Sequence, residues 1–406
     1  MYVTHLESAI DGTKLPANVI QSTYKDKPLW VRYDLTAIRK SLSKSVLKKR
    51  AETLWRYREL LPLPIDVQPV SLGEHITPLI HALELGNQFG VRNLFIKDES
   101  RLPTGSFKSR GMATAITMAK HFGIKRIALP TAGNAGAAAA AYACAAGMEA
   151  FVFMPEDTPK VNQMETKIYG AKVFLVNGLI SDCGRIVREG IKQFGWFNLS
   201  TLNEPYRIEG KKTMGLELAE QFDWKLPDVI LYPTGGGTGL IGMWKGFKEL
   251  EELGWLKEGK LPRMVVVQSD GCCPIVKAFE VGQRFAEPFR NAYTVASGLR
   301  VPSALGDFMI LDAVRESGGT AIAVEEERII KWMKSASQMT GLSICPESAA
   351  CIGAMEQLID NQWIKSGETA VMFNTALGLK YLDATDVQLP HIDVHKDIDW
   401  EMIAEK

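Results

Sequence analysis

The sequence predicts an α/β protein with open, twisted, mostly parallel sheets and helices on both faces. From about residue 93 onward, short apolar runs alternate with helix-like runs, the pattern of parallel strands joined by crossover helices. Several apolar runs end in a glycine-rich or polar turn that opens the next helical run, which is the edge where such sheets bind ligands. With 406 residues and 46% hydrophobic content, the chain can form two or three domains.

Each expected element follows from this alternation. The apolar runs predict strands over 93–98, 126–130, 148–155, 171–177, 196–200, 229–234, 264–270 and 370–376. The segments between them predict helices over 110–121, 134–146, 161–169, 181–193, 209–222, 239–252 and 347–359.

Residues 1–70 follow a different pattern from the rest of the chain. Their second half is a charged helical stretch, KSVLKKRAETLWRYREL, and the whole segment offers little apolar surface of its own. We therefore expect an N-terminal extension packed on the main body, and not a separate domain.

Composition excludes several classes of function. Lys and Arg together number 47, as do Asp and Glu, so no global field favours nucleic acid or an anionic membrane. The N-terminus lacks the regions of a signal peptide, and the alanine-rich run at 135–148 is typical of a closely packed helix, not a membrane span. The 6 cysteines have no CxxC spacing and the 6 histidines have no metal spacing. We expect a cytoplasmic protein without a metal site.

A glycine cluster, PTGGGTGLIG at 233–242, follows an expected strand and opens an expected helix. The free amides and the helix dipole at such a turn form an anion site. Gly237, Gly239 and Gly242 also satisfy G-x-G-x-x-G, and Asp270 ends the next strand, so a dinucleotide site is one interpretation. A tight turn without a ligand is another.

The stretch RLPTGSFKSRGM at 101–112 places Lys108 at an expected helix start. A solvated lysine is the commonest case, but a cation opposes the dipole there unless its pKa is depressed. A lysine with a depressed pKa is the neutral amine that a Schiff base requires. Gly105 and Ser106 would let the backbone approach a planar ligand closely.

Two further polar loops follow expected strands. In TAGNAG at 131–136, Asn134 could be a helix N-cap, or its amide could bond a ligand lying over the sheet edge. In FNTALG at 373–378, Thr375 offers a neutral hydroxyl or is simply a turn residue.

Together these four loops resemble the fold-type II family of pyridoxal-phosphate enzymes, over about residues 71–380. The resemblance implies a tryptophan synthase β-like fold and pyridoxal 5'-phosphate as cofactor. It implies that the PTGSFK lysine forms the Schiff base, that the asparagine bonds the phenolic oxygen, and that the glycine-rich loop holds the phosphate. The C-terminal threonine would meet the pyridine nitrogen. The cofactor contacts implied in this sequence are Phe107, Lys108, Asn134, Gly235, Gly236, Gly237, Thr238, Gly239 and Thr375. A dinucleotide would leave the lysine loop and Asn134 unexplained.

Within that family the chain is most similar to the threonine synthases, through KDESRLPTGSFKSRGM, LVNGL and EPYRIEGKKT. This similarity implies a lyase that converts O-phosphohomoserine and water into threonine and phosphate. Arg207 would be the partner of the substrate phosphate, because an arginine can bind it in bidentate fashion. Thr131, Gly133 and Arg300 are further candidates for substrate contacts.

Other features keep alternative reactions open. Ala135 and Gly136 follow the asparagine where the threonine synthases usually have hydroxyls, and Glu204 lies beside Arg207, where it would repel a phosphate unless it turns away. The GGGTG loop looks more like that of the serine/threonine dehydratases. Dehydratase-like β-elimination, or β-replacement on another amino acid, is therefore the alternative. A cofactor-binding module without activity is a third hypothesis, which intact Lys108 argues against.

The resemblance also implies a domain organisation. A large cofactor-binding domain would comprise residues 71–108 and 209–406, and a smaller, mobile α/β domain would comprise residues 109–208. The smaller domain would close over the substrate. The expected partners are a small amino-acid substrate, phosphorylated in a threonine synthase, and a second copy of the chain in a homodimer.

Overall fold

The computed structural model describes residues 2–257, 259–385, 389–392, 394–395, 397–398, 400 and 403. It contains two mostly parallel sheets and a small antiparallel one. Residue 406, the expected end of the large domain, lies outside the described residues.

The larger sheet has six strands in the order β12-β11-β10-β13-β5-β4, and all neighbours are parallel except β4 and β5. The strands are β4 (Leu79–His81), β5 (Asn93–Asp98), β10 (Val229–Pro233), β11 (Arg263–Ser269), β12 (Thr320–Val324) and β13 (Thr369–Asn374). The expected strands at 93–98, 229–234, 264–270 and 370–376 are confirmed to within a residue or two. The sequence did not predict β4 and β12.

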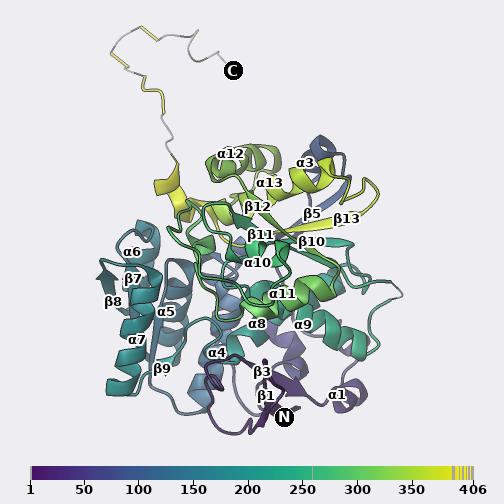
Figure 1. Ribbon diagram of the computed structural model, residues 1–406, viewed down its shortest axis with the longest axis vertical. Coiled ribbons are helices and arrows are strands. Elements are labelled where there is room, and N and C mark those ends of the chain that lie inside the picture. The colour runs from purple at the N-terminus through teal and green to yellow at the C-terminus, as the bar shows by residue number, and fades with distance from the viewer. Residues whose placement is uncertain are drawn as a thin grey trace.

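Helices cover both faces of this sheet (Figure 1), which is why its strands are continuously apolar. Leu231 and Met372 point to a core shared with α3 (Leu83–Phe89), α12 (Ile329–Thr340) and α13 (Pro346–Asp360). Alternate strand residues point to the opposite core. That core includes α8 (Tyr206–Gln221), α9 (Thr238–Glu252), α10 (Pro274–Glu280) and α11 (Asp307–Glu316).

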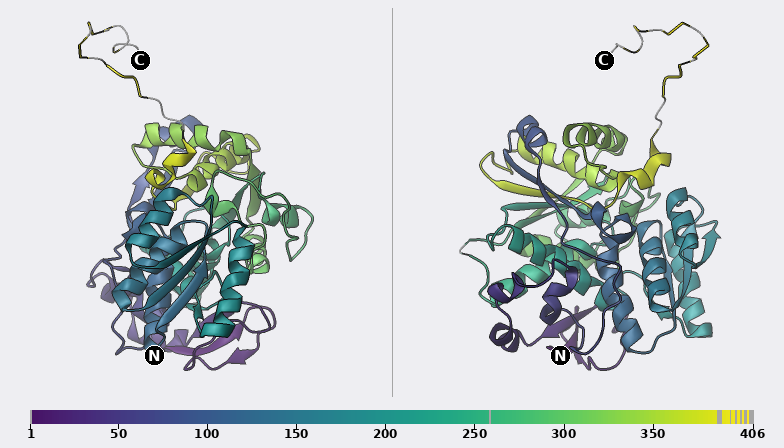
Figure 2. Two further views of the ribbon diagram at one scale, coloured as in Figure 1. Left: turned by 90° about the vertical axis from the view of Figure 1, so that its left-hand side faces the viewer. Right: turned by 180° about the vertical axis from the view of Figure 1, so that it is seen from behind.

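The smaller sheet has four parallel strands in the order β8-β7-β6-β9. They are β6 (Arg126–Pro130), β7 (Glu149–Pro155), β8 (Lys172–Val176) and β9 (Phe197–Asn198). The expected strand at 196–200 is thus only two residues long. The accompanying helices are α4 (Lys108–His121), α5 (Asn134–Ala146), α6 (Lys160–Ile168) and α7 (Ile180–Phe194). Figure 2 shows this sheet with helices on either side.

Residues 3–33 form an antiparallel sheet that the sequence did not predict, in the order β2-β1-β3. Its strands are β1 (Val3–Ser8), β2 (Lys14–Leu15) and β3 (Leu29–Tyr33), followed by α1 (Leu35–Ser41), α2 (Lys44–Leu47) and the 3-10 helix η1 (Leu54–Leu60). Polar contacts join the segment to α8: Tyr57 donates to Glu220 at 2.6 Å, and Arg56 pairs with the same carboxylate at 3.0 Å. Its apolar residues pack against Trp224 and Trp255.

Short 3-10 helices complete the described fold: η2 (Glu99–Arg101), η3 (Pro103–Gly105), η4 (Ser297–Leu299), η5 (Glu326–Arg328) and η6 (Gly378–Ala384). In the part of the chain described here, every helix is too short or too polar to cross a lipid bilayer. All 6 cysteines are free thiols.

A buried ion cluster fixes the start of α4 against its neighbours. The Arg110 guanidinium binds Glu99, at the end of β5, at 2.6 Å and Glu217 of α8 at 2.5 Å. Lys97 completes the cluster by pairing with Glu217 at 3.0 Å. All of these side chains are fully buried, so no water screens the pairs.

Helices α4 and α8 also cross at very close range. A Cβ added to Gly111 would lie 2.8 Å from the backbone oxygen of Arg207, and one added to Gly210 would overlap the backbone carbonyl of Arg110. Both contacts involve main-chain atoms, which cannot rotate aside. The crossing therefore requires glycine at both positions.

We predict that Gly210→Ala lowers the free energy of unfolding by about 1–3 kcal/mol, because the added methyl group forces α4 and α8 apart. Gly184→Ala in α7 is the matched control, since its Cβ would meet only a flexible arginine side chain at 3.4 Å. That control is expected to stabilise the protein by about 0.5–1 kcal/mol through helix propensity. Urea unfolding measures the free energy of unfolding of both variants. Equal changes in Gly210→Ala and Gly184→Ala would contradict the prediction.

Candidate active site

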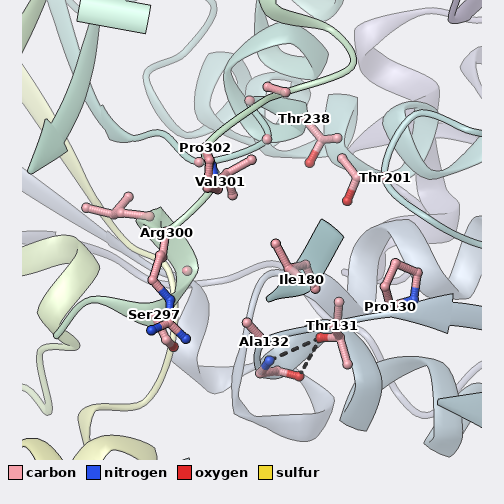
Figure 3. Close-up of a pocket in the computed structure, with 18 of the residues that line it drawn as sticks. Pro130, Thr131, Ala132, Ile180, Thr201, Thr238, Ser297, Arg300, Val301 and Pro302 are labelled. Carbon is pink, nitrogen blue, oxygen red and sulfur yellow. Dashed lines mark hydrogen bonds between the residues drawn. The ribbon is translucent and has the colours of Figure 1, made fainter. Parts of the chain in front are cut away.

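A cavity of about 860 Å³ opens at the carboxyl ends of strands from both parallel sheets. Pro130 ends β6, Pro233 ends β10 and Thr375 follows β13, and all three line it. Figure 3 shows Thr131, Thr238, Ser297 and Arg300 around this cavity. The sequence-predicted residues that line it are Phe107, Lys108, Thr131, Gly133, Asn134, Gly235, Gly236, Gly237, Thr238, Gly239, Arg300 and Thr375.

Arg207 is the predicted site residue that does not line the cavity. Its side chain is buried in α8, where Nη1 donates to the backbone oxygen of Leu199 at 2.7 Å and Nε has no partner among the described residues. One carboxylate oxygen of Glu204 accepts from the backbone N–H groups of Tyr206 and Arg207 at the start of the helix, and the other is buried without a hydrogen-bond partner among the described residues. Burial raises the pKa of Glu204 to about 7, against the opposing effect of the Arg207 charge.

The glycine-rich loop has the form of an anion cradle. Within the described chain, the backbone N–H groups of residues 235–239 donate no hydrogen bond, and α9 begins at Thr238. Gly237 has a φ of +73°, which a side chain would strain. A Cβ on Gly235 would overlap the backbone oxygen of Gly298. Unused amides at a helix N-terminus fit a phosphate group, so the loop suits the phosphate of the expected cofactor.

Gly242 and Asp270, the other two positions of the dinucleotide interpretation, serve packing and loop geometry here. A Cβ on Gly242 would lie 2.9 Å from Cβ of Lys211 and 3.0 Å from the backbone oxygen of Ile208, so this glycine lets α9 approach α8. One Asp270 oxygen accepts the Glu326 N–H at 3.1 Å.

Lys108 lies at the first position of α4, half-buried on the cavity wall. Its pKa falls to about 8 because burial disfavours the charged amine and Arg207 repels it, while Glu347 partly opposes both effects. The sequence predicted a depressed pKa from the helix dipole, whereas burial is the main cause. Its Nζ lies 4.5 Å from the ring centroid of Phe107.

Lys211 is a second buried lysine near this site, and the sequence analysis did not single it out. Its Nζ donates to the backbone oxygen of Phe107 and lies 4.0 Å from the centre of the same ring. Burial lowers the pKa of Lys211 well below its usual range, and the charges of Lys108 and Arg207 lower it further. The proximity of these three basic groups therefore favours the neutral form of the two lysines unless an anion binds beside them.

Asn134 does not cap its helix, so the N-cap interpretation is wrong. Gly133 is the N-cap of α5, and the Asn134 amide donates to the Tyr381 hydroxyl at 2.9 Å. Its oxygen accepts from Lys380 at 3.2 Å. The same lysine binds the Thr104 backbone oxygen and the Glu165 carboxylate, each at 2.6 Å. Lys380 therefore joins the lysine loop, the asparagine loop and α6.

The environment of Thr375 is neutral. Its hydroxyl lies 3.6 Å from the Cys345 sulfur and 3.5 Å from the Ser348 hydroxyl. The same serine accepts the Thr375 backbone N–H at 2.9 Å. Burial raises the pKa of Cys345 to about 12, so this thiol stays protonated.

Arg300 spans the two parallel sheets. It forms a bidentate pair with Asp157, which follows β7, at 2.7 and 2.8 Å. The arginine is thus already paired at the rim of the cavity.

Thr131, on another side of the cavity, accepts a hydrogen bond from the Gly133 N–H at 3.1 Å and shapes the asparagine loop (Figure 3).

Four residues near the site were missed: Lys211, Glu347, Lys380 and Tyr381. The sequence carried a partial signal for them, because Lys211 lies in EGKKT and both Lys380 and Tyr381 directly follow the threonine loop. Among the described side chains, no group of three or more His, Cys, Asp or Glu residues could hold a metal ion.

Comparison with known proteins identifies the relatives of this chain. Residues 70–376 match the family described as pyridoxal-phosphate dependent enzyme. A threonine synthase of Methanocaldococcus jannaschii is 35% identical over 357 residues, or 88% of this chain and 87% of that protein. A threonine synthase of Methanosarcina acetivorans is 36% identical over 356 residues, covering 87% of this chain and 86% of the relative.

Solved structures share the fold at lower identity. The processed form of threonine deaminase isoform 2 from Solanum lycopersicum has a TM-score of 0.66 and 19% identity, covering 82% of this chain and 94% of that one. Maize serine racemase has a TM-score of 0.64 and 22% identity, with coverage of 76% and 93%. These likenesses support the predicted fold class of mostly parallel sheets with helices on both faces.

We predict that the Lys108 amine of the cofactor-free protein titrates near pH 8, and that Arg207→Met raises its pKa by removing a repelling charge. The pH dependence of amine modification at Lys108, followed by peptide mass spectrometry, measures this value. Arg284→Met, which removes a guanidinium paired with Asp312 at the surface, should leave it unchanged. A Lys108 that titrates near the ordinary lysine value would contradict the burial argument.

We also predict that Lys380→Met lowers the free energy of unfolding by about 1–3 kcal/mol, because Glu165 and the Thr104 carbonyl lose a largely buried cation. Lys172→Met, which breaks an exposed pair with Glu149, is the control and should change little. Urea unfolding of both variants measures the difference. Similar small effects would mean that Lys380 does not tie these loops together.

Proposed function

Because the chain belongs to the family of pyridoxal-phosphate-dependent enzymes, we propose that it is a threonine synthase, which converts O-phosphohomoserine and water into threonine and phosphate. It is a pyridoxal-phosphate-dependent lyase. The observation that carries the proposal is similarity to proteins named threonine synthase at 35% and 36% identity over most of the chain.

The residues around the cavity would hold the cofactor at each of its polar ends. The N–H groups of Gly235 to Gly239 would bind its phosphate, and Lys108 would hold its carbonyl carbon through the amine. The Asn134 amide would donate to its phenolic oxygen, and Thr375 would face the pyridine nitrogen. When bound, pyridoxal phosphate withdraws electrons from the α carbon of an amino acid.

Lys108 would then serve as the base for the substrate's α proton. An amine with a pKa of about 8 is partly neutral near neutral pH, and only the neutral form can accept a proton. A neutral Thr375 hydroxyl, unlike a carboxylate, would leave the pyridine nitrogen less protonated. That setting suits elimination and replacement better than transamination.

The basic groups beside the site are compatible with a phosphorylated substrate. Arg207 has a buried Nε without a partner in the described residues, and Lys211 lies close by. The carboxylate of Glu204 accepts the N–H groups that start α8, and burial raises its pKa to about 7, which lessens its repulsion of a phosphate. We propose that Arg207 binds the substrate phosphate after a local rearrangement, since its side chain does not line the cavity.

The same placement of Arg207 favours a second candidate function. If the arginine stays behind the cavity wall, the substrate need not carry a phosphate. Serine/threonine dehydratase-like β-elimination, or β-replacement on another amino acid, would then be the reaction. We further propose a homodimer acting in a reducing, cytoplasmic setting, where the 6 free thiols would persist.

We predict phosphate release with threonine formation when the holoenzyme is incubated with O-phosphohomoserine, measured by colorimetric phosphate assay and amino-acid analysis. Lys108→Ala should lose the visible cofactor band and at least about a thousandfold in kcat, because both covalent attachment and proton transfer fail. If L-serine or L-threonine yields a 2-oxo acid and ammonia while O-phosphohomoserine is inert, the protein is a dehydratase.

A further inference from the structure

Glu347 is a buried carboxylate on the cavity wall with no role in the site described so far. It lies in the first turn of α13, and its side chain is almost fully buried, with a residue exposure of 4%. One oxygen accepts the Gly298 N–H at 2.8 Å. The other, Oε2, is buried and makes no ion pair or well-formed hydrogen bond among the described residues, and the neutral Tyr381 hydroxyl is the donor beside the carboxylate. A buried carboxylate without a countercharge is unfavourable unless a ligand supplies one.

The surrounding backbone holds this carboxylate in place. A Cβ on Gly298 would lie 2.7 Å from Glu347 Oε1, and the Gly298 carbonyl packs against Gly235 of the glycine-rich loop so closely that a Cβ there would overlap it. Gly298 is therefore wedged between the phosphate cradle and Glu347. The carboxylate cannot swing to solvent without moving that peptide.

The charges around Glu347 indicate which kind of ligand group its carboxylate can bind. Glu347 and Lys108 line the same cavity, and the negative charge of Glu347 raises the pKa of that amine. Burial raises the pKa of Tyr381, and the charge of Glu347 and a hydrogen bond to it raise that pKa further, so the hydroxyl remains a neutral donor that leaves the carboxylate without a countercharge. Oε2 can thus bind a cation or accept a hydrogen bond from a donor.

An amino-acid substrate brings such a cation to this place. Its amino group must take the position that the Lys108 amine holds on the cofactor, so a carboxylate near one amine is near the other. We propose that Glu347 is a substrate-binding residue that recognises the α-ammonium group of the amino acid through Oε2. This inference rests on the proposed function only in that the substrate is an amino acid.

The same contact can prepare the amine for reaction. Oε2 takes one ammonium proton: the N–H bond breaks, an O–H bond forms on the carboxylate, and the electron pair stays on nitrogen. The amine is then neutral, which is the form that acts as a nucleophile. The proton returns to solvent or product when the site opens.

The test compares Glu347→Gln with the wild-type holoenzyme. The carboxamide oxygen can still accept the Gly298 N–H, so the variant removes the charge and little else. The ligands are L-threonine, which both candidate functions bind, and 3-hydroxybutyrate, its analogue without the amino group. Dissociation constants come from titration of the visible cofactor band with L-threonine and from competition with 3-hydroxybutyrate. The cofactor dissociation constant is measured separately.

We expect Glu347→Gln to weaken L-threonine binding by about tenfold or more, while 3-hydroxybutyrate and cofactor binding change less than about threefold. Glu356→Gln, on the outer part of the same helix, is the control for removing a charge from α13. It should leave the dissociation constants of L-threonine, 3-hydroxybutyrate and the cofactor unchanged. Equal weakening of both ligands, or no weakening of either, would overturn the inference.

Glu347→Asp keeps the test decisive if the glutamine variant does not fold. The Glu347→Asp variant keeps a carboxylate and should bind L-threonine more tightly than the Glu347→Ala variant does. If the role of Glu347 were purely structural, the two variants would bind L-threonine equally weakly. Failure of the proposed function is a separate outcome. If the wild type does not turn over O-phosphohomoserine but binds L-threonine in a Glu347-dependent way, the inference stands and the synthase proposal fails.

Discussion

The fixed start of helix α4 is the constraint on which the rest of the site depends. Arg110, two residues after Lys108, binds Glu99 directly after β5 and Glu217 of α8, and all three of these side chains are fully buried. Removing one partner of such a buried pair costs about 3–5 kcal/mol, because a charge is left uncompensated. With Gly111 and Gly210 permitting close backbone contact, this cluster sets where the Lys108 amine emerges.

The electrostatics of the site follow from that placement. Lys108, Lys211 and Arg207 are brought together in the interior, so burial and mutual repulsion lower the pKa of both lysines. Anionic groups are what such a region stabilises. The two nearby carboxylates are held in different places: one oxygen of Glu204 accepts the N–H groups that start α8, whereas one oxygen of Glu347 accepts the Gly298 N–H on the cavity wall.

The loops around the cavity are tied across both parallel sheets. Arg300 pairs with Asp157, and Lys380 pairs with Glu165, so segments after η4 and β13 bind the smaller sheet's loop and helix. Asn134 takes part through Tyr381. A motion of the smaller sheet, if it accompanies catalysis, must therefore break or move these contacts.

The sequence by itself determined most of the parallel strands, β12 excepted, the helices that join them up to residue 252, and the loops at their carboxyl ends, because apolar runs and glycine turns are local signals. It also identified Lys108 and the glycine-rich loop, because the residues of each motif are contiguous in the sequence. Tertiary structure alone decided that Asn134 meets Tyr381, that Arg207 lies behind the cavity, and that Glu347 faces it. These contacts join residues far apart in the chain, and burial, which sets their charges, exists only once the helices have packed.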